Sequence, residues 1–357
     1  MPVGKVLLRS NIRDYQATFH TSPAFISDIA GLQKTVFIID SNVWALHSKC
    51  CFKSIKEKDR ILLPANEKQK SLATVESIYD KIMRKAPKKN INIISVGGGI
   101  VQDVTGFVAS TLYRGVNWLY VPTTLLAQAD SCIGAKTSLN YKSFKNLIGT
   151  FYPPSNIYIY PHFLTTLDEG DFLSGVGEIV KLHILGSRTD TQNIISLLPS
   201  ILKKDQATLL RVINRSLRIK KGYIEKDEFD AGIRNMLNFG HCFGHAIETA
   251  TDFKIPHGKA VVIGILLANI VAVKRGLLSS GTAEYLNNKL LLPLIKADIQ
   301  KTRFKISDII NAMKQDKKRT GKGLALVMLV DGNKMKKETD ISDLEAKEAI
   351  AKLIGWS

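Results

Sequence analysis

The sequence has 357 residues, a length at which chains bury a substantial core and usually divide into two domains. Apolar residues make up 45% of it and charged residues 23%, which excludes the low hydrophobicity of a disordered chain. The net charge of +18 favours an anionic partner, which could be a nucleic acid, a membrane surface or a small molecule.

The distribution of lysines narrows the possible classes of partner, and the cysteines and apolar segments bear on the cellular location. The lysines lie in many short clusters without interleaved aromatic residues, so we expect a basic, solvated surface and no nucleic-acid partner. The N-terminus lacks the long apolar region of a signal peptide, and the cysteines show no CxxC spacing. Residues 260–273 are apolar but fewer than the roughly 20 needed to span a bilayer, so they predict a buried helix. We therefore expect a reduced, cytoplasmic protein without a membrane partner.

The first part of the chain predicts an α/β sheet. Short β-rich runs end at Asp40, Pro64, Gly99 and Pro122, and helical patterns lie between them. The clearest helical pattern follows Lys70, where apolar residues recur at three- and four-residue steps. This alternation is typical of parallel strands that carry helices on the faces of their sheet.

The later part of the chain predicts mainly helices. Long amphipathic patterns cover residues 171–185 and 191–226. Residues 324–335 (LALVMLVDGNKM) are an exception, because an Asp-Gly pair between extended residues predicts a hairpin turn. Ser342 and Glu345 have the spacing of a capping box, which predicts a final helix.

The change from strand runs to helical patterns marks the expected domain boundary. It falls near residues 155–170, which include the end of the segment FYPPSNIYIYP (residues 151–161) and the residues after it. We expect one domain over residues 1–160 and another over residues 161–357.

Two segments of the first part could bind a phosphorylated ligand. The triple glycine ending at Gly99 lies between a strand and a helix, so its backbone N–H groups could approach a phosphate, although a tight turn alone would also select glycine. Residues 122–149 form a Gly-interrupted loop region after a strand, where ligands of α/β sheets gather. A solvated polar loop is the alternative, but apolar residues on both sides favour a packed segment. Its polar side chains are Thr123, Thr124, Asp130, Lys136, Lys145 and Asn146.

Histidines and a glutamate of the later part are candidate metal ligands. His241 and His245 are four residues apart, which puts both imidazoles on one helical face, and His257 follows. Zn²⁺ prefers histidine and carboxylate ligands, so spacing alone favours a site built on the first two. Glu178 could supply a carboxylate. However, Glu178 and Lys181 are three residues apart, a spacing more typical of a surface ion pair, which leaves the carboxylate ligand open.

Eight motifs occur in one order along the chain. They are GGGIVQDVTGF, YRG, PTTLLAQADSCIGAKTSLN, KNLIG, GEIVK, DEFDAGIRNMLNFGHCFGHAIE, HGKAV and DKK. As a set they resemble the 3-dehydroquinate synthases and their sugar-phosphate cyclase relatives, from about Asp40 to Val330. The resemblance implies a Rossmann-like N-terminal domain that binds NAD, a mainly helical C-terminal domain that binds metal, and an active site between them.

The resemblance also assigns site residues. It implies that Zn²⁺, for which Co²⁺ could substitute, is bound by Glu178, His241 and His257, and it moves His245 to the substrate side. The implied cofactor contacts are Asp40, Asn42, Glu67, Lys70, Gly98, Gly99, Asp103, Thr123, Thr124, Lys136, Lys145, Phe163 and Thr166. The implied catalytic and substrate contacts are Arg114, Asp130, Lys136, Asn146, Lys181, Lys220, Arg234, Asn238, His245 and Lys318. The basic members of this set suit a substrate with a phosphate and a carboxylate.

The activity that the resemblance implies is the conversion of 3-deoxy-arabino-heptulosonate 7-phosphate to 3-dehydroquinate and phosphate, by a homodimeric lyase of the shikimate-pathway type. One alternative is a cyclase that makes a cyclitol from glucose 6-phosphate or sedoheptulose 7-phosphate. Another is a metal-dependent alcohol or polyol dehydrogenase, against which the lysine-rich set argues. Arg234, Asn238 and His245 favour the first activity, because they serve the carboxylate-bearing substrate in the synthases.

Two positions depart from the common family pattern. Gln102 and Ala135 stand where glycine is usual, since the family commonly has GGGVIGD for GGGIVQD and GGKTAVN for GAKTSLN. Neither departure changes a charged group. We therefore expect altered packing near the cofactor, and the two residues could mark a branch with a different sugar phosphate.

Overall fold

The computed structural model describes residues 2–85, 89–142, 144–302, 304–315 and 323–355. Their contacts divide into two compact units. The first holds Met1–Leu167 and Leu209–Phe229, and the second holds Asp168–Thr208 and Asp230–Ser357. The expected division after residue 160 lies close to the first break but gives Leu209–Phe229 to the other part. The division into domains over residues 1–160 and 161–357 stays a prediction.

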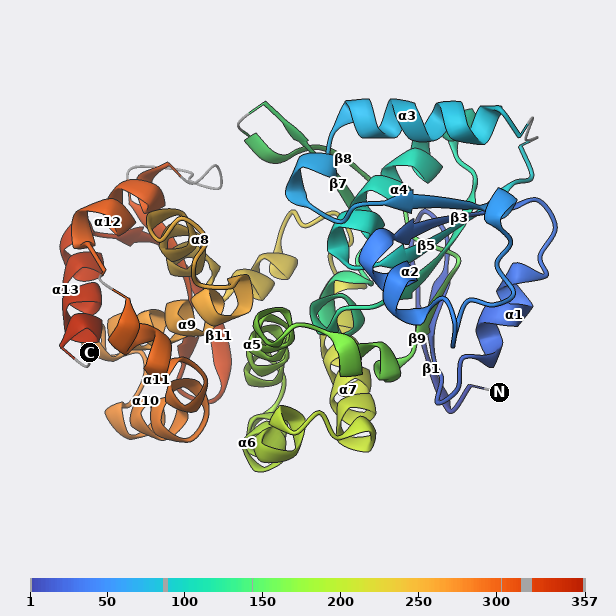
Figure 1. Ribbon diagram of the computed structural model, residues 1–357. Coiled ribbons are helices and arrows are strands. Elements are labelled where there is room, and N and C mark those ends of the chain that lie inside the picture. The colour runs from blue at the N-terminus through green and yellow to red at the C-terminus, as the bar shows by residue number, and fades with distance from the viewer. Residues whose placement is uncertain (1, 86–88, 143, 303, 316–322, 356–357) are drawn as a thin grey trace. The chain divides into compact units, whose positions relative to one another are not determined.

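A seven-stranded sheet forms the centre of the first unit (Figure 1). Its order is β1-β2-β9-β6-β5-β3-β4, in which β1 and β2 are antiparallel and all other neighbours are parallel. The bounds are β1 Gly4–Leu8, β2 Tyr15–Phe19, β3 Thr35–Asp40, β4 Arg60–Leu63, β5 Asn92–Gly97, β6 Asn117–Pro122 and β9 Asn156–Ile159. The strands expected from the sequence are confirmed as β3 to β6. Of these, β3, β5 and β6 are almost wholly buried, as in parallel sheets covered on both faces.

Helices cover this sheet, and side chains cap α2 and α3. They are α1 (Ala24–Ala30), α2 (Ser41–His47), α3 (Leu72–Met83), α4 (Gly99–Thr111) and the greater part of α7 (Gln206–Ile224). The expected helix after Lys70 is confirmed as α3, and the Ser71 side chain caps it by accepting a hydrogen bond from Thr74 N. The Asp40 carboxylate caps α2 by accepting from Asn42 N. Because β5 ends at Gly97 and α4 begins at Gly99, the N-terminus of α4 lies at the carboxyl end of this central strand.

The segment expected as a packed, Gly-interrupted loop region contains regular structure. A π-helical turn, η4 (Ala127–Ser131), follows β6, and the strands β7 (Lys136–Tyr141) and β8 (Phe144–Phe151) then form an antiparallel hairpin. The expectation of a loop was wrong, because the mixture of polar and apolar residues in β7 fits a strand with one face packed on α4 and one face left open. The expected packing of the segment agrees with this contact.

The second unit is mainly helical (Figure 1). Its helices are α5 (Glu169–Leu185), α6 (Arg188–Leu202), α8 (His241–Ala250), α9 (His257–Lys274), α10 (Ser280–Leu286), α11 (Leu292–Lys301), α12 (Ile306–Lys314) and α13 (Asp343–Ile354). The expected hairpin is confirmed as β10 (Leu324–Val330) and β11 (Lys334–Ile341). The long pattern over residues 191–226 divides into α6 and α7.

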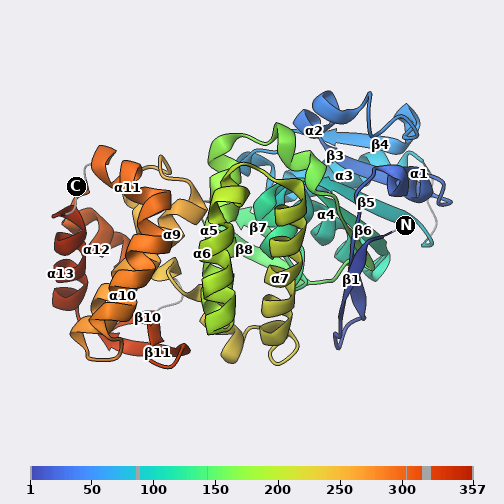
Figure 2. The same ribbon diagram turned by 90° about the horizontal axis from the view of Figure 1, so that it is seen from below.

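Helix α9 is the core of the second unit (Figure 2). It packs against α5, α8, α11, α13 and β10. Within the described part of the chain it is the one helix long and apolar enough to cross a membrane, but 72% of that stretch is buried inside the fold. The buried helix expected over residues 260–273 is therefore confirmed.

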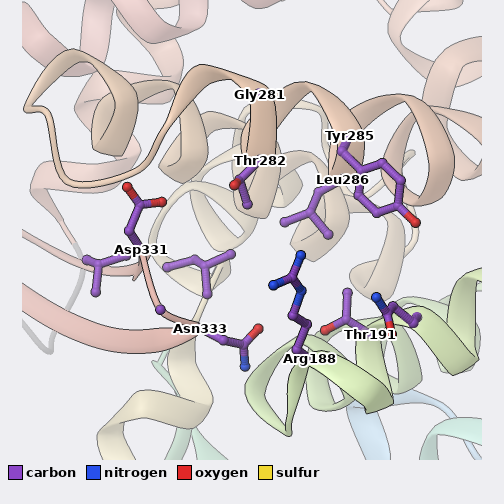
Figure 3. A pocket seen from close by; sticks show the side chains of 12 residues that line it. Arg188, Thr191, Gly281, Thr282, Tyr285, Leu286, Asp331 and Asn333 are labelled. Atoms are coloured by element: carbon purple, nitrogen blue, oxygen red, sulfur yellow. The ribbon is translucent and has the colours of Figure 1, made fainter.

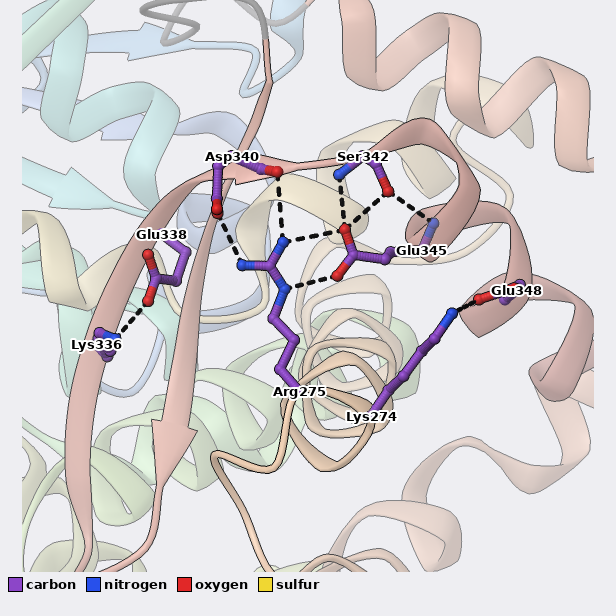
Figure 4. Close-up of polar contacts among 8 residues, drawn as sticks. All are labelled: Lys274, Arg275, Lys336, Glu338, Asp340, Ser342, Glu345 and Glu348. Carbon is purple, nitrogen blue, oxygen red and sulfur yellow. Dashed lines mark hydrogen bonds and ion pairs between the residues drawn. The ribbon is translucent and has the colours of Figure 1, made fainter.

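An ion-pair network fixes the end of α9 to α13 (Figure 4). The Arg275 guanidinium, just past α9, donates from Nε to Glu345 Oε1 at 2.6 Å and from Nη2 to Glu345 Oε2 at 3.0 Å. It also donates from Nη1 to Asp340 Oδ1 at 2.7 Å. Glu345 and Ser342 form the expected capping box of α13. The hydrogen bond from Arg275 is the main reason that the pKa of Glu345 is lowered to about 2.

Candidate metal centre and glycine-loop site

Close contact between α5 and α9 brings two of the metal candidates together. A Cβ atom added to Gly177 of α5 would lie 2.2 Å from Gly258 O, and one added to Gly258 of α9 would lie 1.8 Å from Ser174 O. A side chain at either position would force the helices apart. Glu178 and His257 are the neighbours of these glycines in the chain, so the contact holds them next to each other.

A second contact brings α8 against α9. Gly240, which precedes α8, has a φ of +77° and approaches α9 so closely that a Cβ atom on Gly264 would lie 1.9 Å from Gly240 O. The left-handed φ and the lack of space both require glycine at position 240. His241 is the first residue of α8 and is therefore held beside α9.

Side chains from the middle of α5 and from the first residues of α8 and α9 converge. Glu178 Oε1 lies 3.7 Å from His241 Nε2 and 3.4 Å from His257 Nε2. Ring nitrogens of His241, His245 and His257 lie within 4.8 Å of one another. Ligand atoms bound at about 2.0–2.2 Å to one tetrahedral Zn²⁺ lie about 3.4 Å apart, so a single cation fits among these atoms with small side-chain movements.

The outer nitrogens of two imidazoles are already occupied. His257 Nδ1 contacts Glu248 Oε2 at 3.0 Å, and His241 Nδ1 contacts Phe239 O at 3.2 Å. Carboxylate and carbonyl partners of this kind orient histidines that bind metals through the other nitrogen. The sequence reasoning missed Glu248, although it lies on α8 one heptad after His241 and ends the motif HAIE.

The pair formed by Glu178 and Lys181 is buried. Lys181 Nζ forms an ion pair with Glu178 Oε2, and their side chains are 3% and 1% exposed. The surface alternative for this pair is therefore wrong: α9 covers this face of α5, which the spacing alone does not reveal. Burial of two charges is unfavourable unless they are paired, so this pair indicates a site with a specific use of charge.

The two inner histidines differ in basicity. Burial is the main cause that lowers the pKa of His241 well below the usual histidine value, and the charge of Lys181 adds to it. Burial also acts to lower the pKa of His257, but hydrogen bonds to Glu178 and Glu248 outweigh it and raise this pKa to about 10. A neutral His241 is ready to bind a cation, whereas a cation at His257 has to displace a proton.

The remaining candidates of the second unit lie on the same or adjoining elements. Asn238 ends η6 (Ile233–Asn238) and lines one small cavity with His241 and His245. Arg234 is buried in the same short helix. Lys318, with the motif DKK, lies outside the described residues.

A larger cavity of the second unit holds none of the predicted site residues (Figure 3). Its volume is about 660 Å³, and side chains of α6, α10 and the β10–β11 turn face one another across it. Arg188, Tyr285 and Asn333 are among them. Cavity size therefore does not identify the candidate metal centre.

In the first unit, several cofactor candidates meet at the carboxyl ends of neighbouring strands. Gly98 and Gly99 follow β5, Thr123 follows β6 and Asp40 ends β3. A Cβ atom on Gly98 would lie 2.9 Å from Thr124 Cγ2, whereas one on Gly99 would meet nothing within 4 Å. The Thr123 hydroxyl is buried and has no hydrogen-bond partner among the described residues. An open helix N-terminus beside an unpaired hydroxyl suits a phosphate-bearing ligand.

Polar side chains connect this region to the β7–β8 hairpin. Lys70 Nζ lies 2.7 Å from Asp103 Oδ2 and donates to Asn146 Oδ1 at 2.5 Å. Ser138 Oγ donates to the same Asp103 oxygen at 2.8 Å. Burial raises the pKa of Asp103, and the charge of Lys70 opposes this shift. Ser138 was not among the predicted site residues, because a serine within a strand carries no signal of its own.

Other candidates of the first unit lie at defined places. Glu67 Oε1 accepts from Asn140 Nδ2 at 2.8 Å, and Lys136 and Lys145 are exposed on the hairpin. Phe163 and Thr166 belong to the 3-10 helix η5 (Pro161–Thr166). Arg114 is exposed at the end of η3 (Leu112–Arg114), and no polar contact joins it to another candidate within the described chain.

Asp130 and Lys220 form an ion pair although they are distant in the sequence. Lys220 of α7 donates from Nζ to Asp130 O at 2.7 Å and lies 2.5 Å from Asp130 Oδ1. Gln102 fixes the turn that carries Asp130, since its Nε2 donates to Ser131 O at 2.8 Å and its Oε1 accepts from Ser131 Oγ at 2.9 Å. Gln102, which stands where the family usually has glycine, therefore anchors η4.

Comparisons with known proteins agree with the motifs. The sequence model of the family described as 3-dehydroquinate synthase N-terminal matches residues 60–174, and that of 3-dehydroquinate synthase C-terminal matches residues 175–319. The 3-dehydroquinate synthase of Dictyoglomus turgidum is 38% identical over 298 residues, which are 83% of this chain and 82% of the relative. That of Clostridium tetani is 36% identical over 327 residues, 89% of this chain and 85% of the relative.

Solved structures share the fold. A 2-deoxy-scyllo-inosose synthase complexed with carbaglucose-6-phosphate, NAD⁺ and Co²⁺ has a TM-score of 0.85 and 22% identity, covering 98% of this chain and 100% of that one. A 2-epi-5-epi-valiolone synthase from Streptomyces hygroscopicus subsp. jinggangensis, with NAD⁺ and Zn²⁺ bound, has the same score and identity, covering 99% of both chains. These matches confirm the expected fold class, a Rossmann-like α/β unit with a mainly helical one. On its sequence matches, the chain belongs to the 3-dehydroquinate synthase family.

Proposed function

We propose that the protein is a 3-dehydroquinate synthase that converts 3-deoxy-arabino-heptulosonate 7-phosphate to 3-dehydroquinate and phosphate. The observation that carries the proposal is the convergence of His241 and His257 on the buried Glu178 carboxylate beside Lys181. The chain also covers most of the length of relatives that bear this name. In this assignment the enzyme is a carbon–oxygen lyase acting on a phosphate. A cytoplasmic homodimer is the arrangement that we infer from its family.

Zn²⁺ is the metal that we assign to Glu178, His241 and His257. The donor set fits, because a buried carboxylate lies among imidazoles whose outer nitrogens contact Glu248 and a backbone carbonyl. When bound, the cation supplies Lewis acidity toward the hydroxyl groups of the substrate. Co²⁺ is a reasonable substitute, since it is present in the inosose synthase structure.

NAD is the cofactor that we assign to the first unit. Support comes from the open N-terminus of α4 at Gly98 and Gly99, from the unpaired Thr123 hydroxyl and from the buried Asp40 carboxylate at the end of β3. When bound there, NAD would supply reversible hydride transfer with the substrate. We assign the other predicted cofactor contacts, which run from Asn42 to Thr166 in the sequence, to the same NAD site.

The protein's own side chains bind and orient the substrate in this proposal. The buried guanidinium of Arg234 and the amide of Asn238 suit its carboxylate, because Arg offers paired donors to a carboxylate. The imidazole of His245, close to the two histidine ligands, can take a proton from a substrate hydroxyl at one of its ring nitrogens. Lys136, Lys181 and Lys220 supply positive charge for the phosphate and for the anion that forms as it leaves.

Two other activities are the alternatives. A cyclase acting on glucose 6-phosphate or sedoheptulose 7-phosphate is suggested by the solved neighbours, but their identity of 22% supports the fold alone. An alcohol dehydrogenase is suggested by a glycerol dehydrogenase from Schizosaccharomyces pombe, whose TM-score is 0.64 at 16% identity. The relatives that exceed 30% identity favour the synthase.

The test is an assay of the zinc-loaded protein with NAD⁺ and each of the three sugar phosphates. We expect phosphate release and the mass of 3-dehydroquinate with the heptulosonate alone, and no net NADH. Product from glucose 6-phosphate or sedoheptulose 7-phosphate instead would contradict the substrate assignment. Net NADH would indicate a dehydrogenase.

A further inference from the structure

We propose that the end of α2 carries a second metal site, formed by His47, Cys50 and Cys51, for a thiophilic d¹⁰ cation such as Zn²⁺ or Cd²⁺. Each of these residues offers one ligand atom, and the three atoms lie within 4.8 Å of one another. The site lies in the first unit, whereas the candidate centre at Glu178 lies in the second. The proposal does not depend on the proposed activity.

The spacing of the three residues places them on one face of a helical turn. Cys50 and Cys51 follow His47 by three and four residues, and side chains at these spacings are neighbours on a helix. The backbone keeps this geometry past the end of α2, because Cys50 N and Cys51 N both donate to His47 O, at 3.2 and 2.8 Å. Two sulfurs and one imidazole therefore face the same point.

The distances suit a cation with sulfur ligands. Cys50 Sγ lies 3.3 Å from Cys51 Sγ and 3.8 Å from His47 Nδ1. With metal–ligand distances of about 2.3 Å for sulfur and 2.0–2.1 Å for nitrogen, the ligand atoms of a tetrahedral site lie about 3.5–3.8 Å apart. A cation therefore needs only small rotations of the cysteine side chains. A fourth ligand can come from water, since Cys50 is exposed.

The histidine is held for this role by its other nitrogen. His47 Nε2 contacts the hydroxyl oxygen Thr166 Oγ1 at 2.9 Å, which leaves Nδ1 facing the sulfurs. The rings of Phe52 and Phe163 contact the imidazole edge to face, with centroids 6.4 and 5.1 Å away. A hydrogen bond at the far nitrogen is how proteins orient a metal-binding histidine.

The alternative is a pair of thiols that merely pack in the core. Cys51 belongs to the hydrophobic cluster of the first unit, and burial is the main cause that raises the pKa of its thiol to about 12. A cation must therefore displace a proton there, which only a metal with high affinity for sulfur does readily. This requirement favours Zn²⁺ or Cd²⁺ over Mg²⁺ or Ca²⁺.

The experiment uses the full chain under a phosphine reductant and titrates it with Cd²⁺. Sulfur-bound Cd²⁺ gives a thiolate-to-metal charge-transfer band in the ultraviolet, whereas a glutamate–histidine centre gives none. We expect the band to saturate at about one sulfur-bound cation per chain. Cys50→Ser, a change at an exposed position that the fold tolerates, should abolish most of the band, and so should Cys51→Ser.

The other two cysteines provide matched controls. Cys132→Ser and Cys242→Ser should keep the full band, because neither residue belongs to the cluster. A band that persists in Cys50→Ser, or a wild-type chain without a band when the other centre is saturated with Cd²⁺, would overturn the proposal. Thr166→Val should weaken Cd²⁺ binding about 10–100-fold while the band remains, because it removes the partner of His47 Nε2. Unchanged affinity in that variant would reject the orienting contact.

Discussion

Buried charge and its partners are the main features at the scale of single residues. Glu178 and Lys181 are almost fully buried in α5, where an isolated charge would be unfavourable, and two imidazoles approach the same carboxylate. Glu248 extends this arrangement by contacting the outer nitrogen of His257. A cation at the centre would balance the carboxylates, so the metal should be tightly bound.

We predict that His257→Ala removes bound zinc and nearly all activity, because the variant lacks one of the proposed ligands. Glu248→Gln should keep the three ligands and weaken zinc binding about 10–100-fold. His162→Ala, at an exposed histidine of the first unit, is the matched control and should retain its zinc. Metal analysis by mass spectrometry measures all three. Full zinc occupancy in His257→Ala would reject the ligand assignment.

A second prediction concerns Ala135, whose φ of +61° lies in the left-handed region. Alanine is strained there, which accounts for the glycine usual in the family pattern. Ala135→Gly should increase the free energy of unfolding by about 0.5–1 kcal/mol, measured by urea denaturation. Ala351→Gly, in the regular helix α13, should lower it by a similar amount. A loss of stability in both variants would contradict the strain at position 135.

At the scale of elements, contacts between helix backbones determine where the site residues lie. Helices α5 and α8 each meet α9 through glycines, and each contact holds a neighbouring metal candidate in place. The network of Arg275 then fixes the other end of α9 to α13. The position of the candidate metal centre therefore depends on helix packing more than on loops.

The third prediction tests this dependence at Gly258. Gly258→Ala should lower the free energy of unfolding by about 1–3 kcal/mol and weaken zinc binding, because its methyl group would collide with the backbone of α5. Gly222→Ala in α7 is the control. It has open space around its Cβ position and should be neutral or stabilising by up to about 1 kcal/mol. Normal zinc affinity in Gly258→Ala would show that the close contact is not needed for the centre.

The fourth prediction follows from the lowered pKa of Glu345. Since its pKa of about 2 in the folded protein is below the ordinary value of 4.5, its stabilising effect is fully present above about pH 4.5. That contribution is lost as the pH falls toward 2. Urea unfolding at about pH 7 and about pH 3 should therefore show a smaller loss of stability in Glu345→Gln than in the wild type. Equal losses would contradict the role of the Arg275–Glu345 pair.

At the scale of the whole molecule, the two proposed binding functions lie in different units. The cofactor candidates belong to the first unit and the proposed metal ligands to the second. A mutation that impairs cofactor binding should therefore leave metal binding intact, and a mutation that impairs metal binding should leave cofactor binding intact. This separation allows mutations to be assigned to the cofactor or to the metal by direct binding measurements.

The fifth prediction uses this separation. Lys136→Ala should weaken binding of NAD or of the sugar phosphate, because it removes a positive charge from the β7–β8 hairpin. Zinc content should stay unchanged, since the proposed ligands belong to the other unit. Calorimetry with NAD⁺ and steady-state kinetics would measure the loss. Unchanged binding and kinetics would show that this part of the hairpin does not contact the ligands.

The sequence predicted the regular elements better than it predicted the site. Strands β3 to β6, helix α3 and the capping box at Ser342 followed from periodicity and caps, which are local. Glu178 could not be recognised from spacing, because its burial depends on α9, which lies far along the chain. The family motifs supplied it. The contacts of Glu248 and Ser138 escaped both approaches, since each depends on tertiary structure around a common residue.

The return of Leu209–Phe229 to the first unit has a consequence for synthesis. The sheet is complete in sequence at β9, but α7 with Lys220 follows only after α5 and α6 of the other unit have been made. On the ribosome, the first unit therefore cannot reach its final structure until residue 229 has emerged, which is after the first part of the second unit has been made. A chain cut after residue 160 would lack this helix and expose the apolar surface that it covers.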